Sequence, residues 1–509
     1  MAGIERDVGL RGVEDHVDVL IVGAGLSGVG AACHLQRRCP GRSFAIVEAR
    51  SAIGGTWDLF RYPGVRSDSD MFTLGYSFKP WEDAKAIADG PSIRAYVREA
   101  AMENGVQEKI RFDTRALSAE WSSERSEWSV ELEGPGGVRS TIGCSFLFGC
   151  TGYYRYDEGF TPRFEGVERF AGTVVHPQHW PEDLDYAGKR VIVIGSGATA
   201  VTLVPAMAPD AAHVTMLQRS PSYVLSLPGD DPVAKLARRW LPPPAAYAIV
   251  RWKNALMALG LYTLSRRRPS LVKRLLRRAT RRRLPAGYDV DTHFNPTYNP
   301  WDQRMCLVPD GDLFEAISSG EASVVTGAID RFTQDGVLLE DGRALEADIV
   351  ITATGLNLLA LGGIELAVDG READIAETVG YKGMMLSGIP NFAFAVGYTN
   401  ASWTLKADLV SEYVCRLLGY MRERGYDAVT PLPPDPSQPT LPFLDLDSGY
   451  VRRSIDSFPR QGAVTPWRLN QNYPRDVRLL RHGPVEDAGV RFSRSSPHAA
   501  ESAEPRIAA

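Results

Sequence analysis

The chain has 509 residues, 44% of them apolar and 23% charged, which is the composition of an ordinary globular protein with two or three domains. Its net charge is −5. Its six cysteines, none spaced as C-x-x-C, are too few for a disulfide scaffold and favour a reducing, cytoplasmic location. The N-terminal stretch MAGIERDVGLRGVEDHVDVL is unlike a signal peptide, and the apolar run that follows it is broken by glycines and too short to span a bilayer. No residue spacing predicts a metal site.

The first organised unit reads as strand, glycine turn, helix and second strand. Val17–Val22 has strand length, GAGLSG follows at 23–28, and a helical segment is expected to end near Pro40. A second strand, FAIVE, ends at Glu48. This order predicts a βαβ unit that binds a dinucleotide.

The residues of this turn indicate which dinucleotide it binds. Gly23 permits the tight bend, Gly25 lets backbone N–H groups approach a pyrophosphate, and Gly28 allows the helix to pack closely on the strand. Glu48, 20 residues beyond Gly28, is placed to accept hydrogen bonds from ribose hydroxyls, and its charge would repel a 2′-phosphate. The turn therefore predicts FAD or NAD and not NADP.

A second pair of glycines, Gly54–Gly55, permits another close backbone approach to the ligand. We expect the residues that follow, Thr56, Trp57 and Asp58, to contact the flavin side of FAD. The alternative is a glycine-rich surface loop with a packed tryptophan.

The same order of elements recurs in RVIVIGSGATAVTLVPAMA, followed by HVTMLQRS. Here the strand-end acid is missing, and Arg219 with Ser220 stands in its place, 19 residues after Ala200. A guanidinium beside a hydroxyl suits a 2′-phosphate, so this second site predicts NADPH. The candidate contacts of the turn and its helix are Gly195, Ser196, Gly197, Ala198, Thr199, Ala200 and Val201.

The pattern predicts an α/β fold with two Rossmann-like dinucleotide-binding domains, the NADPH domain being inserted in the FAD domain. Strands and hairpins are expected over 324–355 and a helix over 405–421, with Leu409, Tyr413 and Leu417 on one face. The tail after Pro497 is poor in large apolar residues and is expected to fray. The expected division is 1–155 for the first part of the FAD domain, 156–185 for a linker, 186–335 for the NADPH domain with a basic helical insert at 232–288, and 336–509 for the second part of the FAD domain and the tail.

Charge is spread unevenly along the chain. Residues 232–288 hold fifteen Lys and Arg and no Asp or Glu, so the remainder carries −20, because −5 minus +15 is −20. This segment mixes Leu, Trp and Arg and suits peripheral contact with an anionic membrane surface. It equally suits a solvated helical insert whose cations pair with acids elsewhere. Nucleic-acid binding is not expected, because no recognised reading module accompanies the charge.

Between the two glycine turns lies FAGTVVHPQHWP, residues 170–181. It resembles the F-x-G-x-x-x-H-x-x-x-W-P fingerprint of the Baeyer–Villiger and related class B flavin monooxygenases, with Phe170, Gly172, His176, Trp180 and Pro181 on the matching positions. In that family the segment links the two nucleotide-binding domains. The resemblance covers about Val17 to Tyr473 and implies a connector role for His176 in preference to direct catalysis.

The resemblance also implies site residues, position by position. It makes Ser27, Glu48 and the stretch Thr56, Trp57, Asp58 and Leu59 FAD contacts, and it places the backbone of Ala116 at the adenine end. Arg66, Ser67 and Asp68 would lie where the nicotinamide and the isoalloxazine meet. Arg304, in WDQRMC, would be the active-site arginine, held by Asp68.

The implied reaction uses NADPH, FAD and O2 to convert a ketone to an ester or lactone through a C4a-peroxyflavin, and Arg304 would stabilise the developing negative charge. An S- or N-oxygenating flavin monooxygenase, acting on thioethers, thioamides or amines, is the alternative. A disulfide reductase would need a redox-active cysteine pair, and no two cysteines are spaced for it. A non-catalytic, membrane-attached nucleotide sensor is a further alternative, which NADPH-dependent O2 uptake would exclude.

Overall fold

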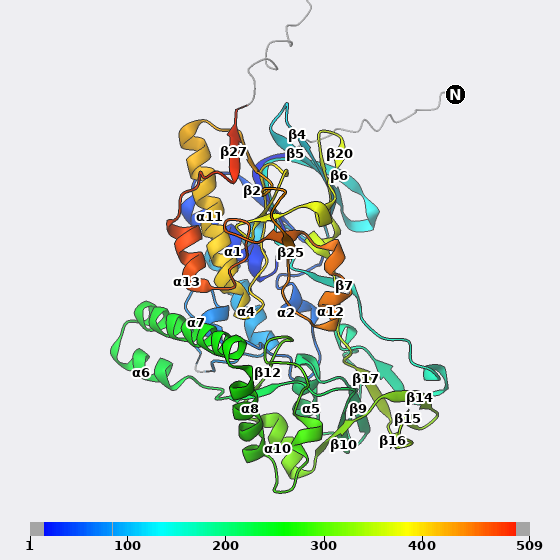
Figure 1. Cartoon of the computed structure of the whole chain (residues 1–509). Coiled ribbons are helices and arrows are strands. Elements are labelled where there is room, and N and C mark those ends of the chain that lie inside the picture. Colours follow the sequence, from blue (N-terminus) through cyan, green and yellow to red (C-terminus); the bar gives the residue numbers. More distant parts are fainter. Residues whose placement is uncertain (1–14, 84, 495–509) are drawn as a thin grey trace, which may run out of the picture.

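The computed structural model describes residues 15–83 and 85–494, and its two largest sheets, of nine and five strands, lie one above the other in Figure 1. The expectations for the N-terminal residues before Asp15 and for the tail after Pro497 concern residues outside these ranges. The α/β fold with two strand–turn–helix units is confirmed, since each glycine turn joins a parallel strand to a helix.

The larger sheet contains the first glycine turn. Its order is β20-β19-β4-β5-β6-β1-β2-β3, and β23 pairs with β6. The strands β1, β2 and β3 run parallel to one another and to β6, whereas β4, β5 and β6 form an antiparallel meander. The bounds are β1 (Asp15–Val22), β2 (Phe44–Val47), β3 (Ile110–Arg111), β4 (Arg115–Ser122), β5 (Glu127–Glu133), β6 (Arg139–Gly149), β19 (Glu365–Val368), β20 (Arg371–Glu372) and β23 (Phe392–Phe394).

Three helices share the apolar core on one face of this sheet: α1 (Leu26–Arg38), α4 (Gly90–Glu103) and α11 (Trp403–Arg424). The expected helix over 405–421 is present as α11, and it is buried on all sides from Thr404 to Cys415. The reason is that α11 packs against α1 on one side. On another side it packs against α13 (Tyr473–Asp476) and the helical segment Val477–His482 that follows.

The smaller sheet contains the second glycine turn and is parallel throughout, in the order β13-β10-β9-β17-β8. Its bounds are β8 (Thr173–Val175), β9 (Arg190–Ile194), β10 (His213–Gln218), β13 (Ala322–Thr326) and β17 (Ile349–Thr352), and it packs against α5 (Ala198–Met207) and α10 (Asp312–Ser319). Two of its strands, β8 and β17, lie outside the range 186–335 that was expected for the NADPH domain. They belong to this sheet because β17 pairs in parallel register with both β8 and β9.

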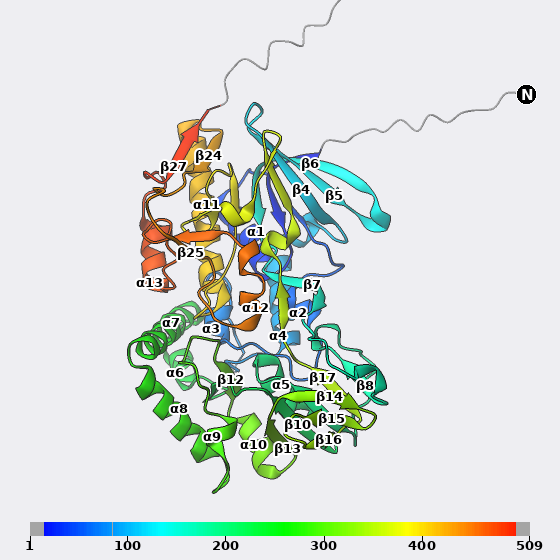
Figure 2. The same cartoon turned by 45° about the vertical axis from the view of Figure 1, so that its right-hand side comes forward.

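Residues 232–283 form three helices, α6 (Pro232–Trp240), α7 (Pro243–Arg267) and α8 (Pro269–Arg283). They lie at the same margin of the molecule in Figure 1 and Figure 2, beside the lower end of α11 and the smaller sheet. Within the described part of the chain, none of the helices has an apolar stretch suited to crossing a bilayer.

Short elements complete the chain. The strands are β7 (Tyr154–Gly159), β11 (Val224–Leu227), β12 (Cys306–Pro309), β14 (Ile329–Thr333), β15 (Gly336–Leu339), β16 (Ala344–Glu346), β18 (Leu356–Leu358), β21 (Gly380–Tyr381), β22 (Met385–Leu386), β24 (Ala428–Pro431), β25 (Thr440–Pro442), β26 (Arg460–Gly462) and β27 (Val490–Ser493). The helices are α2 (Thr56–Leu59), α3 (Met71–Leu74), α9 (Val290–His293) and α12 (Gly449–Arg452).

Candidate functional site

A cavity of about 1140 Å³ lies between the two sheets and is lined by residues of both glycine turns. Most of the predicted site residues line it. They are Gly23, Gly25, Ser27, Glu48, Thr56, Trp57, Arg66, Ser67, Asp68, Ala116, Gly195, Ser196, Gly197, Ala198, Thr199, Arg219, Ser220 and Arg304. Residues predicted from two separate sequence motifs therefore share one cavity, which is large enough for extended ligands.

The first glycine turn has the tight geometry that a dinucleotide cradle needs. Gly23 has φ +103°, and a Cβ there would lie 2.7 Å from the Cys150 carbonyl oxygen. Glu48 is buried behind the turn, where its carboxylate accepts hydrogen bonds from the backbone N–H groups of Ala24 (2.6 Å) and Arg50 (2.9 Å). Burial raises the pKa of Glu48, and these hydrogen bonds act against that rise. Only glycine fits position 23 without moving the neighbouring backbone.

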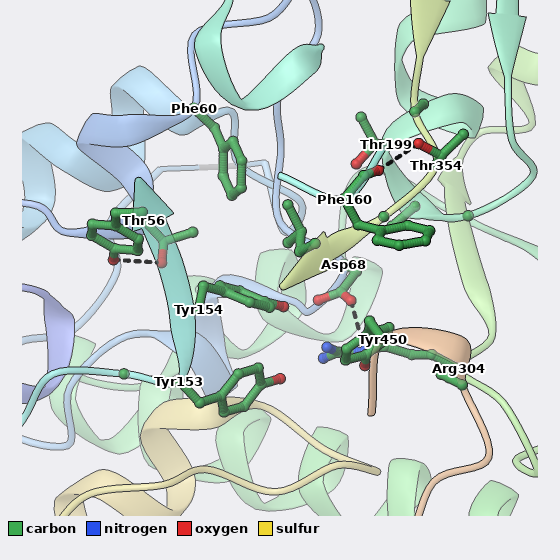
Figure 3. A pocket seen from close by; sticks show the side chains of 18 of the residues that line it. Thr56, Phe60, Asp68, Tyr153, Tyr154, Phe160, Thr199, Arg304, Thr354 and Tyr450 are labelled. Carbon is green, nitrogen blue, oxygen red and sulfur yellow. Dashed lines mark hydrogen bonds and ion pairs between the residues drawn. The ribbon is translucent and has the colours of Figure 1, made fainter. Parts of the chain in front are cut away.

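The glycine pair that follows lies against the first turn. Gly54 forms an isolated parallel β-bridge with Gly25. A Cβ on Gly55, whose φ is +56°, would lie 3.0 Å from the Gly25 Cα. Thr56 begins α2, and its hydroxyl lies 3.0 Å from the hydroxyl of Tyr156 (Figure 3). The two glycine-rich stretches, 30 residues apart in sequence, therefore form one continuous backbone surface on the cavity.

Five of the predicted contacts do not line the cavity. Asp58 is 3% exposed and is bound by Arg50 at 2.7 Å and Arg94 at 3.1 Å, so its carboxylate is already occupied. Burial raises the pKa of Asp58, but the hydrogen bonds from these arginines outweigh it and lower the pKa. The other four pack in the interior: Gly28, Leu59, Ala200 and Val201. A Cβ on Gly28 would lie 1.8 Å from the Gly23 carbonyl oxygen, which agrees with its expected packing role.

The second turn repeats the geometry of the first. Gly195 has φ +136°, and a Cβ there would lie 2.3 Å from the Ala353 carbonyl oxygen. The Ser196 hydroxyl donates to the Ser220 carbonyl oxygen at 3.0 Å, which ties the turn to the end of β10. Arg219 is exposed at this end and has no acidic partner among the described residues. The guanidinium is thus free to bind an anion, as the prediction of a 2′-phosphate site requires.

Arg304 and Asp68 form an ion pair at the cavity, with 3.1 Å between Nε and Oδ2 (Figure 3). Their side chains are 31% and 30% exposed, and both line the cavity. The negative charge of Asp68 raises the pKa of Arg304 well above its usual range, and burial opposes this only in part. Arg304 therefore presents a fixed positive charge to whatever occupies the space.

Arg66 and Ser67 occupy the same loop with different partners. Both Arg66 guanidinium Nη atoms bind the carboxylate of Asp312, the first residue of α10. Ser67 is 2% exposed, and its hydroxyl accepts from the backbone N–H of Ser69 at 2.9 Å. The loop is thus tied to the smaller sheet by Arg66.

An aromatic wall that sequence reasoning did not identify surrounds Arg304. Tyr153, Tyr154 and Tyr450 line the cavity beside it (Figure 3). Trp403 packs on Tyr153 with ring centroids 5.1 Å apart, and its indole N–H donates to the Ser27 hydroxyl at 2.7 Å. A run of two tyrosines after the strand-end CTG was the one signal in the sequence that could have indicated this wall.

The fingerprint segment supplies β8, the edge strand of the smaller sheet, and leads into β9. The Nε2 atom of His176 lies 3.2 Å from the Gly355 carbonyl oxygen. Gly355 lies just after β17, where the chain leaves the smaller sheet. A Cβ on Gly172 would lie 2.3 Å from the Asp348 carbonyl oxygen, and Phe170 packs on Phe332. None of the five fingerprint residues lines the cavity.

This arrangement of two glycine turns, each after a strand with parallel neighbours and before a helix, with a cation fixed between them, is that of a two-dinucleotide oxidoreductase. The sequence of residues 17–235 matches the family model described as flavin-binding monooxygenase-like. Over 481 residues the chain is 56% identical to the FAD-containing monooxygenase EthA of Mycobacterium tuberculosis (strain ATCC 25618 / H37Rv), covering 94% of this chain and 98% of that protein. The chain therefore belongs to the family of flavin-binding monooxygenases.

Two further comparisons bear on the family and on the fold. The chain is 46% identical over 500 residues to the probable FAD-binding monooxygenase AlmA of Acinetobacter baylyi (strain ATCC 33305 / BD413 / ADP1), covering 97% of this chain and 100% of that protein. The solved structure of oxidized steroid monooxygenase bound to NADP has a TM-score of 0.72 at 23% identity, covering 94% of this chain and 100% of that chain. At this identity the likeness shows a shared fold.

Proposed function

We propose that the protein is an NADPH- and O2-dependent FAD monooxygenase that converts ketones to esters or lactones. In the balanced reaction, a ketone, O2, NADPH and a proton give an ester, NADP⁺ and water. One oxygen atom enters between the carbonyl carbon and a neighbouring carbon, and the other leaves as water. The observation that carries the proposal is the Arg304–Asp68 ion pair in a cavity shared by both glycine turns.

The residues present fit both cofactors. The glycine cradle at 23–28 and 54–55 and the buried Glu48 suit FAD, and the turn at 195–200 with the free Arg219 suits NADPH. When bound, FAD supplies the redox chemistry, accepting a hydride from NADPH and delivering an oxygen atom from O2 to the substrate.

Arg304 would act on the substrate and on the negative charge that forms during oxygen transfer. Its guanidinium is held by Asp68 and cannot lose its proton, so it provides a fixed positive charge without any reorganisation. The wall of Tyr153, Tyr154 and Tyr450 would exclude water and hold an apolar ketone against it.

The test is product analysis with purified enzyme, FAD, NADPH and O2 on short and long aliphatic ketones, aryl ketones and thioethers. We expect ester or lactone from at least one ketone class, with one atom of isotopically labelled O2 in each product molecule. Sulfoxide from thioethers together with no ester from any ketone would favour the S-oxygenating alternative and contradict the proposal.

We also infer that the enzyme works in the cytoplasm, in peripheral contact with the inner face of the cell membrane. All six cysteines are free and buried, which suits a reducing compartment. The surplus of fifteen cations at 232–288 suits an anionic surface. We expect part of the protein to sediment with membranes at low salt and to be released by high salt; a purely soluble fraction at both salt concentrations would contradict this.

A further inference from the structure

The exposed large apolar side chains of the described residues are concentrated on α6, α7, α8 and the turn after α6. We propose that the outer face of these three helices is a docking surface for an anionic lipid bilayer. This inference rests on the peripheral contact proposed above and assigns the face that makes it. It does not depend on the reaction catalysed.

On α7 the apolar side chains form a stripe opposite the buried face. Ile249, Trp252, Leu256 and Met257 follow the spacing i, i+3, i+7 and i+8, and their exposed fractions are 50%, 37%, 50% and 57%. This spacing places them on one side of the helix, while Arg251 on the other side is buried. The Trp252 ring meets the ring of Tyr473 at 5.1 Å between centroids. A helix of a globular protein normally has a polar outer face, so the exposed Ile249, Leu256 and Met257 call for a partner.

The helix α6, which packs against α7, also exposes large apolar side chains. Leu236 is 61% exposed and Trp240 is 73% exposed, one turn apart on the same side of the helix. Tryptophan is enriched at the boundary between water and lipid, because its ring is apolar and its N–H is polar. An exposed Trp240 at the end of α6 therefore suits a membrane surface.

The cations on α8 show which kind of lipid would bind. Arg274, Arg278 and Arg282 share one side of α8 with the exposed Leu271 and Leu275. The three arginines are exposed, and none has an acidic partner among the described residues, whereas Arg277 and Arg281 on the adjacent side are paired with Asp291. A row of unpaired arginines beside leucines matches the anionic headgroups and acyl region of a bilayer.

A second copy of this chain fits the face less well. In a symmetric dimer the same patch lies on both subunits, so unpaired arginines would be brought toward one another. Like charges within an interface are unfavourable, whereas an anionic bilayer supplies the opposite charge over the whole face.

The inner faces of the same helices contact the chain segment that carries Arg304. Val272 and Leu276 of α8 belong to one buried cluster with Met305. Arg266 at the end of α7 is paired with Asp302 at 2.7 Å. A docked bilayer would thus lie on the far side of α7 and α8 from the candidate active site, and docking would leave the cavity-lining residues themselves in place.

The test is co-sedimentation of the full-length, FAD-loaded protein with lipid vesicles, without NADPH or substrate. We expect binding to vesicles of equal parts phosphatidylglycerol and phosphatidylcholine and none to pure phosphatidylcholine. The triple variant R274Q/R278Q/R282Q is expected to lower the partition coefficient about 100-fold, because each cation near an anionic surface contributes roughly fivefold. The matched control is R169Q/K189Q/R371Q, three exposed cations on other elements.

A second variant tests the apolar part of the surface. L236S/W240S/M257S is expected to weaken vesicle binding at least tenfold, while M102S/V138S/V464S, which changes exposed apolar residues elsewhere, leaves it unchanged. Equal loss in a test variant and its control, equal binding to both vesicle types, or no binding would overturn the inference. A dimer that is lost in L236S/W240S/M257S, with no vesicle binding by the parent protein, would assign the face to a second copy instead. Because no turnover is measured, failure of the proposed reaction would leave this result unaffected.

Discussion

At the scale of single residues, the two dinucleotide turns differ in the charge of the side chain beside each. Glu48 is buried behind the first turn, and Arg219 is exposed and unpaired beside the second. A carboxylate in the first position and a guanidinium in the second discriminate between dinucleotides with and without a 2′-phosphate. We therefore propose that the preference for NADPH depends on Arg219, an exposed side chain that can be removed without disturbing packing.

We predict that Arg219→Ala raises KM for NADPH about 10- to 100-fold and leaves KM for NADH nearly unchanged, because a charge-assisted hydrogen bond to the 2′-phosphate is lost. Steady-state kinetics with both nucleotides measures this. Lys189→Ala removes an exposed cation from the start of β9 and is the control. An equal rise of KM for both nucleotides in the Arg219 variant would show that Arg219 does not read the phosphate.

At the scale of elements, one buried carboxylate fixes three helices around the candidate active site. Asp408 of α11 accepts from Arg251 of α7 at 2.9 Å, lies 3.1 Å from His34 Nε2 of α1, and accepts from the Ser77 backbone N–H at 2.8 Å. Burial raises the pKa of Asp408, but the contacts with His34 and Arg251 outweigh it and lower the pKa. Replacing it leaves a buried guanidinium without its counter-charge.

We predict that Asp408→Ala lowers the free energy of unfolding by about 3–5 kcal/mol at neutral pH, since Arg251 loses its buried partner. The pKa of Asp408 is lowered in the folded protein, so its stabilisation is present above the ordinary pKa and is lost as the pH falls through the lowered pKa. The difference between parent and variant should therefore shrink in acid. Denaturant unfolding at several pH values measures it.

The control for this experiment is Asp341→Ala, which removes an exposed carboxylate paired with Arg343 at 2.7 Å. An exposed ion pair of this kind contributes less than about 1 kcal/mol. If the two variants destabilised the protein equally, the buried cluster would not hold the helices together as argued.

Much of each element could be predicted from the sequence, because its determinants are close together in the chain. The strands that precede the two glycine turns, the glycine positions and Glu48 follow from spacing alone. Asp58 was predicted as a flavin contact because it follows Gly54–Gly55, but its carboxylate is bound by Arg94, 36 residues away. Tyr450 reaches Arg304 from a segment nearly 150 residues further along, and no local pattern encodes such a contact.

At the scale of the whole molecule, the two sheets are joined by connectors that touch one another. The fingerprint segment leads into β9, and the chain after β17 returns to the larger sheet past Gly355. The contact of His176 Nε2 with the Gly355 carbonyl oxygen joins the end of β8 to the chain that leaves the neighbouring strand β17. Burial lowers the pKa of His176, so the ring is neutral at neutral pH and acts as a fixed hydrogen-bonding group.

We predict that His176→Ala slows reduction of the bound flavin by NADPH about fivefold without changing FAD content, because the hydrogen bond between the end of β8 and the chain that returns to the larger sheet is lost. Stopped-flow measurement of flavin bleaching tests this. His179→Ala changes an exposed histidine of the same segment and is the control. A similar slowing in both variants would argue that the segment is only a tether.

The central claim is that the cation of Arg304, fixed by Asp68, makes oxygen insertion into a ketone possible. The most direct measurement compares ester formation by the parent enzyme and Arg304→Ala at equal FAD content, with NADPH oxidation followed in parallel. We expect FAD binding and NADPH oxidation to persist in the variant while ester formation falls about 10²- to 10³-fold, the usual effect of losing one preorganised electrostatic contact. Ester formation at the parent rate in Arg304→Ala would contradict the account.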